Sequence, residues 1–432
     1  MPSYAAFLGH QPRISIAELA ATISDFTLER IVDRSVALFR SNEELSQEHL
    51  NRWGGIFLLA RQVSESDVSL ENVPQLLTNE LKTVRGKVTF SLRAIGVARP
   101  KVRDLYRACK QALKKQGRAS RYVGNERIPA ATALLRDTGV TDGSHGAELV
   151  LLREVRDDDE FLWIGRTVAA QDPDAYTERD MKKPVRDTRV GLLPPKLAQV
   201  MLNFGVWLAG KDRGQRTEDR GKGRSPTSEV RRPKSLVVLD PFCGTGVIPM
   251  EALLRGLPVL ASDLSLKAVN GCEKNLEWMR KKYDIKKSIL PSAVFKHNAL
   301  QPFDFSELRD PILREGPNVI VTESHLGPAL TGRPNAKEAA KLRTENEALQ
   351  IAFLKNVAAL LPGIPIVITW PVWYLKTGPL FLEKAWKAIA DLGFNPMLPP
   401  HTEPDIPNHF SLLYRRPDQI VGREIILLKP RK

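Results

Sequence analysis

The sequence predicts an α/β protein whose carboxyl-terminal half forms a mostly parallel sheet covered by helices, preceded by smaller α+β units. Short apolar strand-like runs alternate with helical segments from Ser235 onward. The first of these runs leads into a glycine turn at Gly244 and Gly246, as at the carboxyl end of a first parallel strand. The chain has 432 residues, 42% of them hydrophobic, which predicts two to three domains with ample cores.

Residues 1–65 predict a small α+β domain. Three apolar runs indicate strands, over Tyr4–Leu8, Ala37–Phe39 and Ile56–Val63. Between the first two, Ser15–Ile23 indicates a short helix. Ser15 is its expected amino-terminal cap, because Glu18 follows three residues later, as in a capping box.

Residues 66–175 predict a second unit. Lys87–Gly96 indicates a strand, and Lys101–Gln116 is the clearest helix of this region. Its apolar side chains recur every three or four residues, at Val102, Leu105, Tyr106, Cys109 and Leu113. We therefore expect Cys109 in the core and Gly117 at the helix end. Two further strands are expected over Ala147–Val155 and Phe161–Ala169, on either side of an acidic turn.

Residues 176–432 predict the third domain. The expected strands are Leu236–Leu239, Val259–Ser262, Ala293–His297, Val319–Thr322 and Ile364–Thr369. The expected helices are Val247–Leu254, Lys267–Lys281, Lys337–Leu361 and Phe381–Leu392. A hairpin of Ser411–Tyr414 and Glu424–Leu428 closes the sheet with an antiparallel end.

The segment 211–235 interrupts this order. It holds nine basic and four acidic residues, several Gly and Pro, and almost nothing apolar. This composition predicts a disordered insertion, because such a segment buries too little apolar surface to fold. Contact with nucleic acid and a purely solvated loop both remain open for it.

The positive charge is concentrated rather than spread. The chain carries a net charge of +14, and residues 82–136 contain fifteen Lys or Arg against two acidic residues, a net +13. Clustered cations favour a polyanion, because binding releases its condensed counterions. A solvated face without a partner is the alternative, and a membrane surface is a weaker one. The candidate RNA-binding residues are Arg103, Arg107, Lys110, Lys114, Arg118 and Arg121.

Three other classes are disfavoured by the sequence. Cys109, Cys243 and Cys272 are few, distant and odd in number, which argues against a disulfide framework or a cysteine zinc site. The seven histidines lack ligand spacing, so no metal is expected. No apolar run approaches the length of a membrane span, and the amino terminus lacks the pattern of a secretory signal. We expect a soluble, cytoplasmic protein.

The glycine turn carries the strongest chemical signal. It reads Asp240-Pro-Phe-Cys-Gly-Thr-Gly246 between a strand and a helix. A dinucleotide site would place a third small residue where Pro249 stands, and the acid at 240 would repel a pyrophosphate. The acid instead suits a ligand with an ammonium group and no phosphate, such as S-adenosylmethionine. Asp263 follows the next strand, where a carboxylate can hold both ribose hydroxyls, and Asn298 follows the third, where it can meet an adenine amine.

The candidate cofactor-binding residues are therefore Asp240, Phe242, Gly244, Gly246, Asp263, Leu264, Asn298 and Ala299. With Glu251-Ala252, the turn resembles the cofactor motif of class I methyltransferases, and its particular form is similar to that of the THUMP-associated RNA guanine-N2 methyltransferases. Upstream stretches agree with this resemblance: Gly165-Arg166-Thr167, Gln171-Asp172, Tyr176, Arg179-Asp180, Arg186-Asp187, Gly191–Ala198 and Asn203.

The resemblance implies a ferredoxin-like amino-terminal domain over 1–65, a THUMP domain over 66–175 and a Rossmann-like methyltransferase domain over 176–432. In that family the THUMP domain binds the acceptor end of tRNA. The basic block at 82–136 falls within the region that matches it. The implied partner is therefore RNA, and tRNA in particular, with the protein as a monomer or with an accessory protein.

The sequence departs from the family at the catalytic loop. After the fourth strand the family carries Asp/Asn-Pro-Pro-Tyr/Phe, whereas this chain has Thr322-Glu-Ser-His-Leu-Gly-Pro328. We expect Glu323, Ser324 and His325 to be the catalytic residues, with Glu323 accepting hydrogen bonds from an exocyclic amine and His325 stacking on the base. Methyl transfer depends mainly on positioning of the nitrogen, because the cofactor carries the leaving group.

These observations predict an S-adenosylmethionine-dependent RNA methyltransferase that modifies the exocyclic N2 of a guanosine in tRNA. Two alternatives stay open. One is an inactive RNA-binding protein with a degenerate catalytic loop, and the other is a DNA amine methyltransferase.

Overall fold

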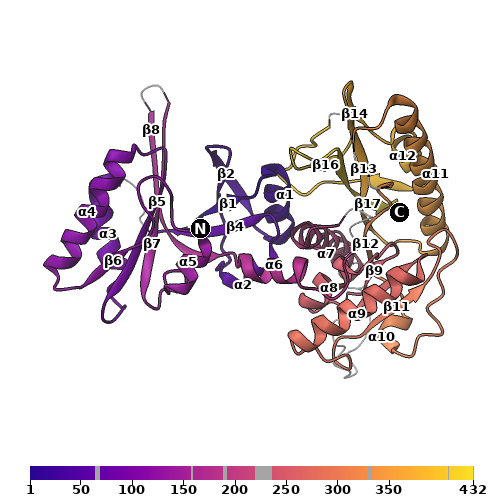
Figure 1. Cartoon of the computed structure of the whole chain (residues 1–432), viewed down its shortest axis with the longest axis horizontal. Helices are drawn as coiled ribbons and strands as arrows, with labels where there is room; N and C mark the ends of the chain where they lie inside the picture. Colours follow the sequence, from indigo (N-terminus) through magenta and orange to yellow (C-terminus); the bar gives the residue numbers. More distant parts are fainter. Residues whose placement is uncertain are drawn as a thin grey trace. The chain divides into compact units, whose positions relative to one another are not determined.

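The computed structural model describes residues 1–63, 69–156, 159–187, 192–218, 236–328, 330, 332–406 and 408–431. The chain divides into two compact units, Met1–Tyr176 and Thr177–Lys432. In Figure 1 the first runs from indigo to magenta and the second from magenta to yellow. Each unit is built on its own sheet.

The first unit contains one eight-stranded sheet in the order β2-β3-β1-β4-β8-β7-β5-β6. Its strands are β1 (Ser3–Leu8), β2 (Thr27–Val32), β3 (Val36–Arg40), β4 (Ile56–Gln62), β5 (Val88–Ile95), β6 (Ser120–Tyr122), β7 (Gly146–Arg156) and β8 (Asp159–Ala170). β4 pairs antiparallel with β8, so one sheet runs through both amino-terminal regions of the sequence. The domain boundary at residue 65 stays a prediction.

The helices of this part are α1 (Pro12–Thr22), α2 (Gln47–Arg52), α3 (Val73–Glu80), α4 (Arg99–Lys115), α5 (Thr132–Asp137) and α6 (Pro173–Met181), which contains the division between the units. The expected apolar stripe of α4 is confirmed, because all five of its side chains are buried. Cys109 lies in this core, and burial raises the pKa of its thiol to about 12. The sequence did not predict α3, a helix of only eight residues.

The predicted cap at Ser15 is wrong. α1 begins at Pro12, and Gln11 occupies the capping position. The Ser15 hydroxyl is buried and donates to the Gly55 carbonyl at 2.7 Å. Glu18 accepts from the backbone N–H groups of Gly54 and Gly55 at 2.9 and 2.7 Å. The Ser/Glu pair therefore binds a distant turn rather than the start of its own helix.

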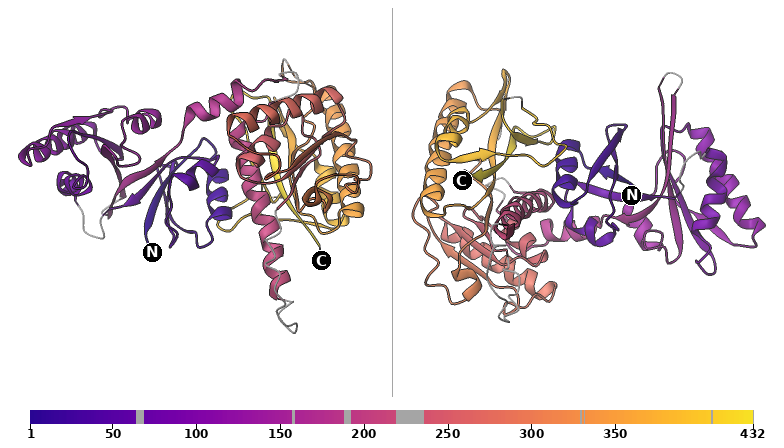
Figure 2. Two further views of the ribbon diagram at one scale, coloured as in Figure 1. Left: turned by 90° about the horizontal axis from the view of Figure 1, so that it is seen from below. Right: turned by 180° about the vertical axis from the view of Figure 1, so that it is seen from behind.

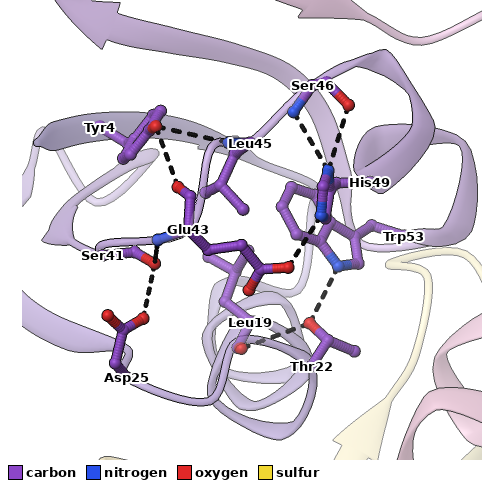
Figure 3. A network of polar contacts seen from close by, with 10 residues as sticks. All are labelled: Tyr4, Leu19, Thr22, Asp25, Ser41, Glu43, Leu45, Ser46, His49 and Trp53. Atoms are coloured by element: carbon purple, nitrogen blue, oxygen red, sulfur yellow. Dashed lines mark hydrogen bonds and ion pairs between the residues drawn. The ribbon is translucent and has the colours of Figure 1, made fainter.

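A polar network fixes α1 and α2 to the first strands (Figure 3). The Trp53 indole N–H donates to the Thr22 hydroxyl at 2.9 Å, and the Ser41 hydroxyl donates to Asp25 at 2.6 Å. The Tyr4 hydroxyl of β1 donates to the Glu43 carbonyl at 3.1 Å. Since these partners are far apart in sequence, the network holds the amino-terminal elements as one packed body.

The second unit contains a nine-stranded sheet in the order β11-β10-β9-β12-β13-β17-β15, with β14 paired to β13 and β16 to β17. Its strands are β9 (Val238–Asp240), β10 (Val259–Asp263), β11 (Ser292–Lys296), β12 (Val319–Glu323), β13 (Ile366–Leu375), β14 (Gly378–Leu380), β15 (Phe394–Pro396), β16 (Ser411–Tyr414) and β17 (Val421–Pro430). The strands from β11 to β13 are parallel, and β17 pairs antiparallel with β13, β15 and β16. The predicted mostly parallel sheet with an antiparallel end is confirmed.

The helices of the second unit are α7 (Pro195–Glu218), α8 (Val247–Leu254), α9 (Leu266–Lys282), α10 (Pro311–Arg314), α11 (Ala336–Leu360) and α12 (Glu383–Asp391). Within this unit, α7, α8 and α9 lie on one face of the sheet and α11 and α12 on the other (Figures 1 and 2). α7 approaches β12 so closely that a Cβ at Gly205 would lie 2.6 Å from a Val321 methyl. The main core lies between the sheet and the α11–α12 pair.

The predicted start of the disordered insertion needs correction. α7 continues through 211–218, the first eight residues of that segment, and 219–235 lie outside the described residues. Lys, Arg, Gln and Glu are good helix formers, and no proline interrupts this stretch. A buried helix can therefore propagate into it despite its lack of apolar residues. In the described parts of the chain, none of the helices is long and apolar enough to cross a membrane.

Candidate active site

A cavity of about 530 Å³ lies in the second unit, where β9, β10, β11 and β12 end. The loops that follow these four strands line it, together with residues 185–187 and 192–193. The strand order changes direction at β9. The strands β10 and β11 lie on one side of β9, and β12 lies on its other side. Ligands of open α/β sheets bind at such a switch point.

Asp240, the last residue of β9, is a buried carboxyl group of the cavity whose surroundings shift its pKa strongly. It is 2% exposed and accepts from the Thr322 hydroxyl at 2.6 Å and from the Phe242 N–H at 3.3 Å. Burial raises the pKa of Asp240 to about 8, and the hydrogen bond from Thr322 only partly offsets this cost. Asp240 is therefore largely protonated at neutral pH in the absence of a cationic partner. A cationic ligand group beside it would favour the carboxylate.

The two glycines of the turn have different roles. Gly244 has a φ of 51°, lines the cavity, and has no atom within 4 Å of the position of a Cβ. Gly246 has a φ of 88° and caps α8. A Cβ at Gly246 would lie 2.6 Å from the Cys272 Sγ of α9. Gly244 therefore leaves room for a ligand, whereas Gly246 allows the close packing of α8 against α9.

Asp263, at the end of β10, links the glycine turn to the start of α9. One carboxylate oxygen accepts from the Gly244 N–H at 3.0 Å and the other from the Ser265 N–H at 2.8 Å. The amino-terminal cap of α9 is Ser265, whose hydroxyl accepts from the Ala268 N–H. Asp263 thus holds the turn, and each oxygen retains acceptor capacity toward the cavity that it lines. Leu264 beside it is 65% exposed.

The remaining candidate cofactor-binding residues also line the cavity. Asn298 follows β11, and its side-chain oxygen accepts from the Leu300 N–H at 3.0 Å. Ala299 is buried, and its carbonyl accepts from an amide of α11. Phe242 packs edge-on against Phe353 of α11, with ring centroids 5.2 Å apart. The structure therefore brings seven of the eight predicted cofactor residues to one cavity, and Gly246 lies behind it.

The loop after β12 forms the opposite wall of the cavity, with Glu323, Ser324 and His325 all lining it. His325 is exposed, as a stacking group must be. Ser324 is 2% exposed, and its hydroxyl donates to the Thr369 carbonyl at 2.7 Å and accepts from the Gln350 amide at 2.9 Å. The Ser324 hydroxyl is therefore engaged by the fold, and the catalytic roles expected for Glu323, Ser324 and His325 stay predictions.

Glu323 has a partner that the sequence analysis missed. Arg423 of β17 donates from Nε to Oε1 of Glu323 at 2.5 Å and from Nη2 to Oε2 at 3.5 Å. The Arg423 side chain is 4% exposed and that of Glu323 13% exposed. No local signal marks Arg423, because it lies on β17, 100 residues from Glu323 along the chain.

A segment before α7 closes one side of the cavity. The Asn275 side chain of α9 accepts from the Val185 N–H and donates to the Val185 carbonyl, both at 2.9 Å, and donates to the Thr245 carbonyl at 2.8 Å. Lys267 forms an ion pair with Asp187 at 2.9 Å. The resemblance had included Arg186-Asp187 as part of a sequence motif, and the structure places both on the cavity.

Glu251, which belongs to the sequence motif, does not line the cavity. It is fully buried on α8 and forms an ion pair with Arg179 at 2.7 Å. Burial raises its pKa despite the arginine. Its role is to join α8 to the segment that precedes the sheet. Among the described residues, no group of three His, Cys, Asp or Glu side chains is arranged to hold a metal ion.

The predicted RNA-binding cations lie in the first unit. Arg103, Arg107, Lys110 and Lys114 are exposed on α4, as is Arg121 on the edge strand β6. Arg118 differs from this set. Its guanidinium donates to the Leu81 carbonyl at 2.6 Å and to the Val84 carbonyl. Arg118 therefore also ties down the chain that follows α3, and its part in RNA binding stays a prediction.

No known family profile matches the chain. Over 127 residues it is 31% identical to a tRNA (guanine(10)-N2)-dimethyltransferase from Methanothermobacter thermautotrophicus, a match that covers 29% of this chain and 30% of the relative. The crystal structure of TrmN from Thermus thermophilus covers all of both chains with 15% identity and a TM-score of 0.47. A possible methylase from Clostridium difficile 630 covers all of this chain and 98% of its own, with 10% identity and a TM-score of 0.43.

The strand order, the antiparallel end and the cavity beyond the carboxyl ends of the strands define the class. The second unit has a Rossmann-like α/β fold, with its cavity at the switch point of the parallel sheet. The predicted fold class is thereby confirmed for this unit. The chain spans less than a third of the curated relative that it matches.

Proposed function

We propose that the protein is an S-adenosylmethionine-dependent RNA methyltransferase that modifies the exocyclic N2 of a guanosine in tRNA. The observation that carries this proposal is the cavity in which Asp240 and Asp263 flank the open turn at Gly244. The similarity to a relative that is named as a tRNA guanine-N2 dimethyltransferase supports the choice of substrate. The remaining support comes from the chemistry of the cavity and of α4.

The cavity fits a cationic, phosphate-free nucleoside. Asp263 retains acceptor capacity for ribose hydroxyls, and Asn298 offers an amide to an adenine edge. Asp240 is buried without a cation, which is why its pKa is high, and an ammonium group would remove that cost. When bound, S-adenosylmethionine supplies a methyl group on sulfur, and the C–S bond breaks as the acceptor nitrogen forms the new C–N bond.

The loop after β12 would receive the acceptor base. Glu323 accepts from the amine and orients its lone pair, while His325 covers one face of the ring. A base must leave its stack to enter such a pocket, and this costs a few kcal/mol unless stacking and hydrogen bonds compensate. The nitrogen releases one proton after transfer, and exposed His325 marks the side open to solvent.

The exposed cations of α4 support RNA as the partner. Arg107 forms an i,i+3 ion pair with Asp104 at 3.5 Å, but both side chains are largely exposed and a phosphate can compete for the arginine. Reversing the charges of Arg103, Arg107 and Lys110 is expected to flatten the log–log salt dependence of RNA affinity by up to about 0.9 per lost duplex phosphate contact. Filter binding from low to moderate salt measures this slope. An unchanged slope would remove α4 from the RNA-binding surface.

Methyl transfer is tested by mass spectrometry of nucleosides from tRNA and rRNA incubated with the protein and labelled cofactor. We expect N2-methylguanosine or its dimethyl form in tRNA. Calorimetric titration of the cofactor runs in parallel. Cofactor binding without any transfer would favour the alternative of an inactive RNA-binding protein, which the engaged Ser324 hydroxyl and the paired Glu323 make a concrete rival. Transfer to DNA in preference to RNA would establish a DNA amine methyltransferase instead.

A further inference from the structure

We propose that Arg423 is a positioning residue that holds Glu323 as a two-oxygen acceptor, and that this pair selects a base edge with two adjacent donors. Guanine presents such an edge at its N1–H and N2 amine. The inference rests on the proposed function, and it concerns a residue of β17 that lies outside every sequence motif of the site.

The geometry of the pair is fixed from three sides. Arg423 contacts both carboxylate oxygens of Glu323, and its Nη2 also donates to the Leu192 carbonyl at 3.2 Å. Its backbone is held between two strands, because β17 pairs with β13 at Pro371 and with β16 at Tyr414. A side chain that is 4% exposed and bound at three points cannot swing with the loop. Glu323 is consequently held in one orientation.

Glu323 keeps acceptor capacity toward the cavity. An ionised carboxylate offers about four lone-pair positions, and Arg423 uses one on each oxygen. Glu323 also lines the cavity, so part of its carboxylate faces the ligand space. The free positions are one per oxygen, which matches a pair of parallel N–H donors. Bidentate pairing of this kind is strong and geometrically specific.

The pair discriminates between bases by its charge. Guanine places two donors side by side, at N1–H and the N2 amine. Adenine and cytosine place an acceptor nitrogen next to their amine, and that lone pair would face a carboxylate oxygen. A buried acceptor that faces another acceptor loses its hydrogen bonds to water and gains none in return. Sites that recognise a base by hydrogen bonds therefore reject adenine and cytosine strongly.

Arg423 contacts Glu323 directly. Among the described residues, the other acidic and basic side chains that line the cavity with Glu323 are Arg186, Asp187, Asp240, Asp263, Lys267, His297 and His325. These are common to wild type and to any Arg423 variant. A difference between the transfer rates therefore reports on the arginine.

The test compares single-turnover methyl transfer in wild type, Arg423→Gln, Arg423→Lys and Glu323→Gln. We expect Arg423→Gln to be slowed about tenfold or more, because Glu323 loses both contacts that hold its carboxylate in one orientation. Arg423→Lys should recover part of the rate. Glu323→Gln should be slow, and the double variant no slower than Glu323→Gln alone. Cofactor affinity should be unchanged in all four.

A charge-swapped variant, Glu323→Arg with Arg423→Glu, separates positioning from stability. It restores an ion pair but removes the acceptor from the loop, so it should melt near wild type and transfer no methyl. Glu424→Gln is the matched control, since it removes a buried carboxylate at the next position of β17 whose hydrogen-bond partners are His409 and Ser411, outside the cavity.

The outcomes separate this inference from the function on which it rests. A wild type that transfers no methyl to RNA overturns both. A wild type that transfers methyl, with an Arg423→Gln variant that transfers at the same rate or with activity in the charge-swapped variant, overturns the role of Arg423 alone.

Discussion

The two halves of the cavity are built in different ways. The half around Asp240, Gly244 and Asp263 consists of strand ends and the backbone that follows them. Its hydrogen bonds run within and between the loops that follow β9 and β10, apart from the one that Thr322 of β12 donates to Asp240. The half around the β12 loop depends on distant elements. Ser324 is held by α11 and β13, and Glu323 by β17.

This difference teaches which functional residues a single sequence can reveal. Parallel strands end at one edge, so residues that follow them must meet, whatever the rest of the chain does. A hydrogen bond between an arginine and a glutamate 100 residues apart has no such guarantee. The variants below test whether the first half binds the cofactor and the second half acts on the acceptor.

The largest effect is expected for Asp263→Ala, which should weaken S-adenosylmethionine binding by about 2–3 kcal/mol, or roughly 30- to 150-fold. The reason is the loss of charge-assisted bonds to two ribose hydroxyls. Titration calorimetry measures it, with Asp263→Asn as the matched variant that keeps one acceptor. If the alanine variant melts earlier but binds the cofactor as wild type does, Asp263 only secures the turn and the start of α9.

Gly246→Ala should cost about 1–3 kcal/mol of stability, because its Cβ would meet Cys272 Sγ at a strained positive φ. Urea unfolding of the full chain measures this cost. Gly244→Ala is the control at the other end of the turn, where the Cβ position is open. It should lose less stability and more cofactor affinity. Equal stability losses in the two variants would show that Gly246 is not required for the packing of α8 against α9 any more than Gly244 is.

Cofactor binding should strengthen with pH between 6 and 8, by at most about tenfold per unit. Burial raises the pKa of Asp240 to about 8, so the Asp240 carboxyl group must release a proton before it can pair with an ammonium group. The raised pKa of Asp240 also lowers the free energy of unfolding of the ligand-free protein as pH rises from about 4 to 8. Over that range Asp240 holds fewer protons in the unfolded chain than in the folded one. Asp240→Asn should abolish both trends. Affinity that stays flat from pH 6 to 8 would exclude Asp240 as the ammonium partner.

The smallest effect is expected in the acceptor half. His325→Ala should slow single-turnover transfer about fivefold, which is 1 kcal/mol and the low end of base–aromatic stacking. His325→Tyr should hold or raise the rate, and both should bind the cofactor as wild type does. Rates in the two variants that match wild type would show that His325 is only an exposed loop residue.

Much of the fold could be predicted from the sequence because short-range sequence patterns determine its helices and strands. The alternation of strands and helices in 236–428 and the apolar stripe of α4 are local patterns, and the structure confirms both. The errors arise where tertiary contacts override local preference. Ser15 and Glu18 look like a capping box but bind the turn at Gly54 and Gly55. Nor does a local pattern show that Arg118 binds two backbone carbonyls.

The sequence by itself determined which residues gather in the cavity around the turn at Gly244. A glycine turn after the first strand and acids after the first two can meet only at one edge of a parallel sheet, so residue type and spacing were sufficient. Only the tertiary structure decided the state of the acceptor loop. Whether Glu323 is free or paired, and whether the Ser324 hydroxyl is available, depends on side chains that α11, β13 and β17 bring to it. Those contacts form only when these distant elements pack together, and no periodicity in the sequence predicts them.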